Sequence, residues 1–141
     1  MRRIFSFLVV CLCLCLSIRA QSIVGSWRLT WLLIEGDMAY SIVAPVTLSI
    51  QKNGRISGNG GCNSFSGSFA FKQPKKFKKA VKIKFGDILS TEMFCDRASN
   101  TEKAFFRSLR EAATVFIIKG ELQIKSPKIG NAMHFVTVAK P

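Results

Sequence analysis

The sequence predicts a mostly β (α+β) protein: a compact, antiparallel, barrel-like sheet of seven or eight strands with one inserted α-helix. Three observations lead to this fold class. Short apolar segments that alternate with a period of two recur along the chain, and turns rich in glycine and asparagine separate them. A single clear segment, which starts at Ser99, spaces its apolar residues as a helix does. A meandering sheet of this size curls toward a barrel because closure buries one face and protects the edges.

The first twenty residues are expected to be a secretory signal peptide rather than part of the sheet. A basic start at residues 1–3 precedes an almost wholly apolar run at residues 4–16 and a more polar exit that ends at Ala20. The apolar run is short for the ~20 residues of a membrane-spanning helix, although an uncleaved anchor is the alternative. Cleavage after Ala20 leaves a single domain, residues 21–141, that is periplasmic or secreted and has no transmembrane segment.

Removal of the signal peptide changes both the charge and the cysteine content. Three arginines leave with it, so that 18 basic and 8 acidic residues give the mature domain a net charge of about +10. Of the five cysteines, only Cys62 and Cys95 remain. Two cysteines in an exported domain favour a disulfide, which would stabilise the fold by roughly 3–4 kcal/mol on the chain-entropy model. Two buried free thiols are the alternative.

The strands follow from alternation and from turn residues. Residues 27–34 are apolar and β-prone, and residues 46–50 alternate. Asn53-Gly54 is a strong signal for a two-residue hairpin turn, because such a turn needs positive φ at both central positions; a strand is expected to resume at Ile56. The other expected strands are 68–72, 81–85, 115–118, 122–124 and 133–138.

The helix is expected to begin at a capping box. In this arrangement Ser99 accepts a hydrogen bond from the helix start and Glu102 reaches back to it. Phe105 and Leu109 follow at helical spacing, and the helix is expected to end near Thr114.

The glycine-rich segment around Cys62 and the segment before the helix carry a family resemblance. From about Gly25 to Phe135, the chain resembles the META (HslJ-like) domain family in the order and spacing of its residues. The matching residues are Trp27, Thr47, Leu48, Gly61, Cys62, Asn63, Gly67, Phe69, Ser90, Thr91, Met93, Cys95, Glu102, Phe106, Leu109 and Leu122. Phe69 matches as an aromatic residue, although tyrosine is common at its position and at that of Phe116. Glu92 stands where the family usually has a basic residue, and Phe94 where it has a small one.

The resemblance implies a small, single-helix, barrel-like sheet in an envelope or secreted protein, with links to stress, antibiotic tolerance or virulence. It implies no catalytic residue, ligand or cofactor. We expect part of the matching set to be a structural motif: Gly61, Cys62, Asn63, Gly67, Thr91, Met93, Cys95 and Glu102.

No catalytic site is expected, and the protein is interpreted as a non-enzyme. His134 is the only histidine, and nothing in the spacing brings it to a cysteine or to a particular serine, as nucleophilic catalysis requires. The carboxylates are scattered rather than paired for acid–base work. The glycines around Cys62 favour positive φ or a close strand crossing over an anion-binding nest. Ser64 and Ser66 are interpreted as turn residues.

The methionine and cysteine residues before the helix allow two interpretations, a soft metal site or part of the apolar core. Met93 and Cys95 are two residues apart on an expected strand, and with Met133, His134 or Cys62 they could ligate copper(I). Methionine and cysteine at alternating positions are more often core residues, so no metal or other cofactor is expected. A small-ligand or metal-binding module that uses the barrel interior or its mouth is the alternative function.

The strongest surface feature is a run of lysines without an intervening acid. Its members are Lys72, Lys75, Lys76, Lys78, Lys79, Lys82 and Lys84. Such a cluster attracts anionic lipid or polymer by up to ~1 kcal/mol per lysine, whereas export argues against nucleic acid. A solvated hairpin tip is the alternative. The sequence thus predicts a monomeric, exported, stress- or envelope-related protein whose basic hairpin contacts anionic envelope components.

Overall fold

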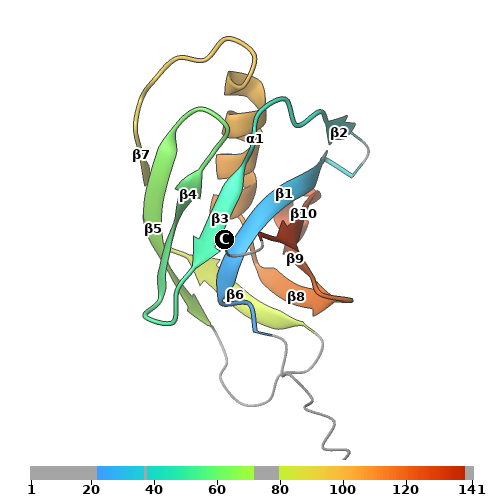
Figure 1. Cartoon of the computed structure of the whole chain (residues 1–141). Helices are drawn as coiled ribbons and strands as arrows, with labels where there is room; N and C mark the ends of the chain where they lie inside the picture. The colour runs from blue at the N-terminus through green and yellow to red at the C-terminus, as the bar shows by residue number, and fades with distance from the viewer. Residues whose placement is uncertain (1–21, 37, 72–79, 139–141) are drawn as a thin grey trace, which may run out of the picture.

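The computed structural model describes residues 22–36, 38–71 and 80–138, which form a closed antiparallel barrel of eight strands (Figure 1). Two short additional strands and one α-helix complete this part of the chain, so the predicted fold class is confirmed. The predicted signal peptide, residues 1–20, and the lysines of the range 72–79 lie outside the described residues. In the described part, no helix has the length and apolar composition needed to cross a bilayer.

The barrel strands follow one another in the order β1-β3-β4-β5-β6-β8-β9-β10, and β10 pairs with β1 to close the cylinder. The short strand β2 pairs with β1 and the short strand β7 with β5. The elements are β1 (Gly25–Ile34), β2 (Met38–Tyr40), β3 (Thr47–Ile50), β4 (Arg55–Asn59), β5 (Ser64–Phe71), β6 (Val81–Phe85), β7 (Leu89–Ser90), α1 (Ser99–Arg110), β8 (Thr114–Ile118), β9 (Glu121–Ser126), a 3-10 turn (Pro127–Ile129) and β10 (Asn131–Thr137).

Two hairpin turns show how turn chemistry sets the register. Lys119 and Gly120 both have positive φ (51° and 83°), as a tight two-residue turn between β8 and β9 requires. In the hairpin between β3 and β4, only Gly54 has positive φ (80°). Asn53 instead accepts a hydrogen bond from the backbone N–H of Arg55 (3.1 Å). The hairpin predicted at Asn53-Gly54 is confirmed, but the prediction of positive φ at both positions is wrong.

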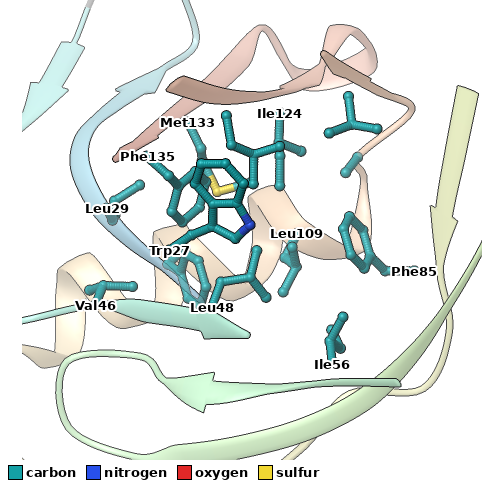
Figure 2. Packing of buried hydrophobic residues seen from close by; sticks show 14 of the residues in the cluster. Trp27, Leu29, Val46, Leu48, Ile56, Phe85, Leu109, Ile124, Met133 and Phe135 are labelled. Carbon is teal, nitrogen blue, oxygen red and sulfur yellow. The ribbon is translucent and has the colours of Figure 1, made fainter. Parts of the chain in front are cut away.

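The barrel interior is filled by the inward-facing half of each alternating strand. On β6, Ile83 and Phe85 are 1% and 4% exposed, whereas Lys82 and Lys84 face outward, as predicted. Figure 2 shows the Trp27 ring in the centre of the core, close to Met133 and Phe135. Its indole N–H donates to the carbonyl of Ile23 (2.8 Å), so the one polar atom of this large side chain is satisfied.

The helix packs against the barrel where the sheet is joined most weakly. Strands β6 and β8 share only two residue pairs, and α1 contacts β6, β9 and β10 around this joint. Phe105 and Leu109 of α1 are fully buried, and Phe65 of β5 meets both Phe105 and Phe106 edge-on. The predicted apolar face of the helix is therefore the face that seals the core.

The helix starts at Ser99, as predicted, but the predicted capping box is wrong and the helix ends before the predicted Thr114. The N-cap is Ala98, and no side chain caps the helix. The hydroxyl of Ser99 donates to the carbonyl of Cys95 (2.6 Å), while Glu102 turns inward and is therefore unavailable to the helix start. At the other end α1 stops at Arg110, because Thr114 already belongs to β8 and pairs with β6.

Candidate functional site

A buried carboxylate lies at the centre of the predicted structural motif. Glu102, in the first turn of α1, is 7% exposed. Its Oε1 accepts the backbone N–H of Asn63 (2.6 Å) and, over a longer distance, that of Cys62 (3.4 Å). Its Oε2 accepts the side-chain amide of Asn63 (2.8 Å). Burial of a carboxylate is tolerated when charge-assisted hydrogen bonds satisfy it in this way.

Asn63 connects this carboxylate to the segment that precedes the helix. Its Oδ1 accepts the hydroxyl of Thr91 (2.8 Å) and the backbone N–H of Met93 (2.7 Å). Its Nδ2 also donates to the carbonyl of Met93 (3.0 Å). A single amide side chain therefore supplies both backbone partners that a sheet would give to Met93, and in Figure 1 the chain after β7 arches over the end of the barrel toward α1.

The two cysteines reinforce the same connection. Cys62 and Cys95 lie at disulfide distance, with Cα atoms 5.9 Å apart and a sequence separation of 33. Cys62 is adjacent to Asn63, and Cys95 follows Met93 by two residues. The covalent brace and the Asn63 hydrogen bonds thus hold the same pair of segments together.

Two glycines of this region are required by close contacts, in agreement with the prediction of close approach. A Cβ on Gly60 would lie 2.7 Å from Oε1 of Glu102 and 2.9 Å from the Phe106 ring. A Cβ on Gly67 would lie 2.8 Å from the carbonyl oxygen of Asp87. Gly60 therefore allows the buried carboxylate to approach, and Gly67 allows the connection between β6 and β7 to lie close beside β5.

The polar groups of the motif are engaged with one another rather than directed to a substrate. Among the described residues, every buried side-chain nitrogen and oxygen has a hydrogen-bond partner. Asn63 uses both ends of its amide, and Glu102 uses both oxygens. Glu102, Asn63, Thr91 and Met93 thus form a hydrogen-bonded hub in which every polar side-chain atom of Glu102 and Asn63 has a partner, as an architectural function of the motif requires.

Of the candidate soft metal ligands, the structure brings Met93 close to the paired Cys62 and Cys95, and it places Met133 in the barrel core and His134 on the outer face of β10. Met93 lies in a loop rather than on the predicted strand, and it is 61% exposed. Met133 is fully buried in the barrel core, and the two cysteines are paired. No group of three or more His, Cys, Asp or Glu side chains suited to a metal ion occurs in the described ranges.

His134 lies on the outer side of β10, away from the cysteines. It faces Trp31 of β1, and the two rings meet edge-on with centroids 4.8 Å apart. Burial lowers the pKa of His134 below its ordinary value of 6.5; the charge of Glu121 partly opposes this, and Lys125 adds to it. The uncharged imidazole is thus favoured, and it packs as a half-buried aromatic side chain.

Of the predicted lysine cluster, the structure describes Lys82 and Lys84, which project from the outer face of β6. Strand register adds a residue that sequence reasoning missed. Lys82 pairs with Thr114, and Thr114 pairs with Lys125 of β9, so the two lysines lie in one row across three strands. The ammonium of Lys125 lies 5.2 Å from the centroid of the Phe116 ring, which holds this side chain against the sheet.

Comparisons with known proteins agree with this architecture. The family model described as the META domain matches residues 21–140. The crystal structure of a DUF4847 family protein from Bacteroides vulgatus is similar in fold, with a TM-score of 0.55 and 12% identity over 83% of this chain and 94% of that one. No curated protein matches the chain.

Proposed function

Because the chain belongs to the META domain family, we propose that it is a non-enzymatic, exported protein that contacts anionic envelope material through a basic outer surface of its barrel. The observation that carries this proposal is the outward projection of Lys82 and Lys84 from β6, at the end of the lysine run in the sequence. The mature chain is taken to act as a periplasmic or secreted monomer with an envelope- or stress-related role.

The hub around Glu102 supports the non-enzymatic part of the proposal. The side chains of the motif that could take part in a reaction are those of Glu102, Asn63 and the two cysteines. All of them are engaged in internal hydrogen bonds or in the disulfide. The cysteine pair also supports export, since disulfides persist outside the cytoplasm.

The described lysines supply only part of the free energy needed for stable attachment to an anionic surface. Lysines near an anionic surface contribute ~1 kcal/mol each, so Lys82, Lys84 and Lys125 together supply about 3 kcal/mol. This free energy is smaller than the ~4 kcal/mol that corresponds to a millimolar Kd. The remaining lysines of the run, in residues 72–79, are therefore needed for stable attachment, and the attachment should weaken with salt.

The test is co-sedimentation of the mature protein with vesicles of phosphatidylglycerol and phosphatidylcholine over a series of salt concentrations. We expect salt-sensitive binding that the triple change Lys82→Gln, Lys84→Gln and Lys125→Gln weakens. A matched control removes the same charge from other elements: Lys52→Gln, Lys103→Gln and Lys119→Gln. Binding that ignores salt, or that both triple variants weaken equally, would contradict a defined basic surface.

A further inference from the structure

A hollow of about 430 Å³ with a mixed polar and apolar lining lies on the outer side of β4 and β5. Its floor is the segment Ser66-Gly67-Ser68 of β5. One wall carries Arg55 of β4, and the opposite wall carries Asp87 from the connection between β6 and β7. The volume falls within the range of about 300–1,000 Å³ that is usual for small-molecule sites.

The hollow exists because the floor is built from small residues between two higher walls. Strand β5 pairs with β6 at Phe69–Phe71 and with β7 at Phe65–Ser66, so the intervening residues 86–88 leave the strand pairing and lie close against the edge of β5 at Gly67. Ile88 is buried and anchors this bulge, while Asp87 remains exposed. Ser57 of β4 lies in register with Ser66, which extends the row of hydroxyls across the floor.

The hollow brings together complementary polar groups. Arg55 lies directly opposite Ser68 in the strand pairing, so its guanidinium belongs to the same end of the floor. The two ion pairs among the described residues are Arg107–Glu35 and Lys128–Glu111, and neither uses Arg55 or Asp87. A guanidinium fork matches a carboxylate, and a carboxylate accepts two neighbouring hydroxyls.

We propose that this hollow binds a hexuronic acid unit, that is, an acidic sugar of an envelope polysaccharide. The sugar carboxylate pairs with Arg55, neighbouring hydroxyls donate to Asp87, and the serines of the floor donate to the ring oxygen and exchange hydrogen bonds with the remaining hydroxyls. The net charge of about +10 on the mature domain favours an acidic sugar over a neutral one. The inference rests on the envelope contact proposed above for its setting, and it names the chemistry that the contact recognises.

The test is a titration of the isotopically labelled, disulfide-intact mature protein with sodium glucuronate, followed by amide resonances in two-dimensional NMR. We expect saturable shifts at Ser66, Gly67, Ser68 and Asp87, with a Kd in the millimolar range, about 4 kcal/mol. Glucose lacks the carboxylate and acetate lacks the hydroxyls, so each should bind at least about tenfold more weakly. No saturable shift at these residues, or acetate binding as well as glucuronate, would overturn the proposal.

Variants separate the groups of the hollow. Arg55→Gln should raise the Kd for glucuronate about tenfold and leave glucose unchanged, whereas Asp87→Asn should weaken both sugars. Ser66→Leu places a larger side chain on the exposed floor and should abolish binding, while thermal unfolding confirms that the fold is kept. Arg97→Gln removes an exposed arginine elsewhere and is the matched control. An Arg55→Gln protein that binds glucuronate normally would refute the assignment.

The vesicle assay keeps this inference distinct from the proposed function. Vesicle binding without glucuronate binding would leave the anionic surface in place and reject the sugar site. Glucuronate binding without vesicle binding would reject the lysine surface and leave the sugar site.

Discussion

The hydrogen bonds of Glu102 should make this residue one of the largest polar contributors to stability. The change Glu102→Ala removes the acceptor of the Asn63 backbone N–H (2.6 Å) and of the Asn63 side-chain amide (2.8 Å). Hydrogen bonds to a charged group are worth about 1.5–3 kcal/mol each, so the loss of two should lower the free energy of unfolding by about 3–6 kcal/mol. The side-chain amide keeps the carbonyl of Met93, which places the loss in the lower half of that range.

The assay is equilibrium urea unfolding of the disulfide-intact mature protein, followed by circular dichroism. Glu102→Gln should cost less, about 2 kcal/mol, because it keeps one acceptor oxygen and turns the other position into a donor that faces a donor. Glu35→Gln is the control: its carboxylate is 66% exposed in a 3.9 Å ion pair, and the change should stay within about 0.5 kcal/mol.

A double-mutant cycle tests whether the contact itself is responsible. Glu102→Ala and Asn63→Ala should show a coupling energy above about 1 kcal/mol, because both remove the same hydrogen bond. A loss below about 1 kcal/mol for Glu102→Ala, or additive single changes, would refute the reasoning. In that case the hub would be a set of independent contacts.

The remaining predictions concern the brace, a glycine and the histidine. Replacing Cys62 and Cys95 by serine should lower the free energy of unfolding by about 2–4 kcal/mol, and a reductant should mimic this; an unchanged urea midpoint would contradict the brace. Gly60→Ala should cost about 1–3 kcal/mol in the same assay, because a Cβ would lie 2.7 Å from Glu102. Since the pKa of His134 is lowered in the fold, the unfolded chain binds the proton more readily. The free energy of unfolding should therefore fall as the pH drops below 6.5, and that of the His134→Gln variant should fall less over the same interval. Equal pH profiles of the two proteins would disprove the effect.

Alternation and turn residues were sufficient to predict the barrel where the strands are long enough to show them. Strand β6 begins and ends at the predicted residues, because Ile83 and Phe85 must face the core while Lys82 and Lys84 face water. Strands β2 and β7 have three and two residues, so they contain too few positions for a pattern. They exist because longer neighbours, β1 and β5, offer free backbone groups beside them.

The errors around the helix start have a common physical cause. A serine three residues before a glutamate predicts local capping, but Glu102 finds stronger partners in Asn63, which is 39 residues earlier. The same asparagine holds Met93, and this explains why the apparent alternation of Met93 and Cys95 belongs to a loop rather than a strand. A tertiary hydrogen bond overrides a local signal, and a single sequence contains no trace of that competition.

The hollow was missed for a different reason. Ser64 and Ser66 were interpreted as turn residues, but both lie on β5, which begins four residues earlier than predicted. Serine and glycine have low intrinsic strand preference, and here the pairing with β4 compensates for it. The small size of these serines and glycines is the sequence signal that could have indicated the hollow. Small residues on a strand leave space above the sheet, and Arg55 lines that space.

The inward-facing and outward-facing residues of β5 have different roles, and this difference indicates where a binding surface lies. The inward residue Phe65 packs against the helix, and the preceding hub around Asn63 fixes the segment that leads into that helix. Any change there alters the stability of the whole barrel. Outward residues such as Ser66 and Ser68 are exposed, so they are available for binding. A recognition surface on this fold should therefore lie on the outer face of strands that the hub holds in place, and Arg55→Gln should change sugar binding without changing the urea midpoint.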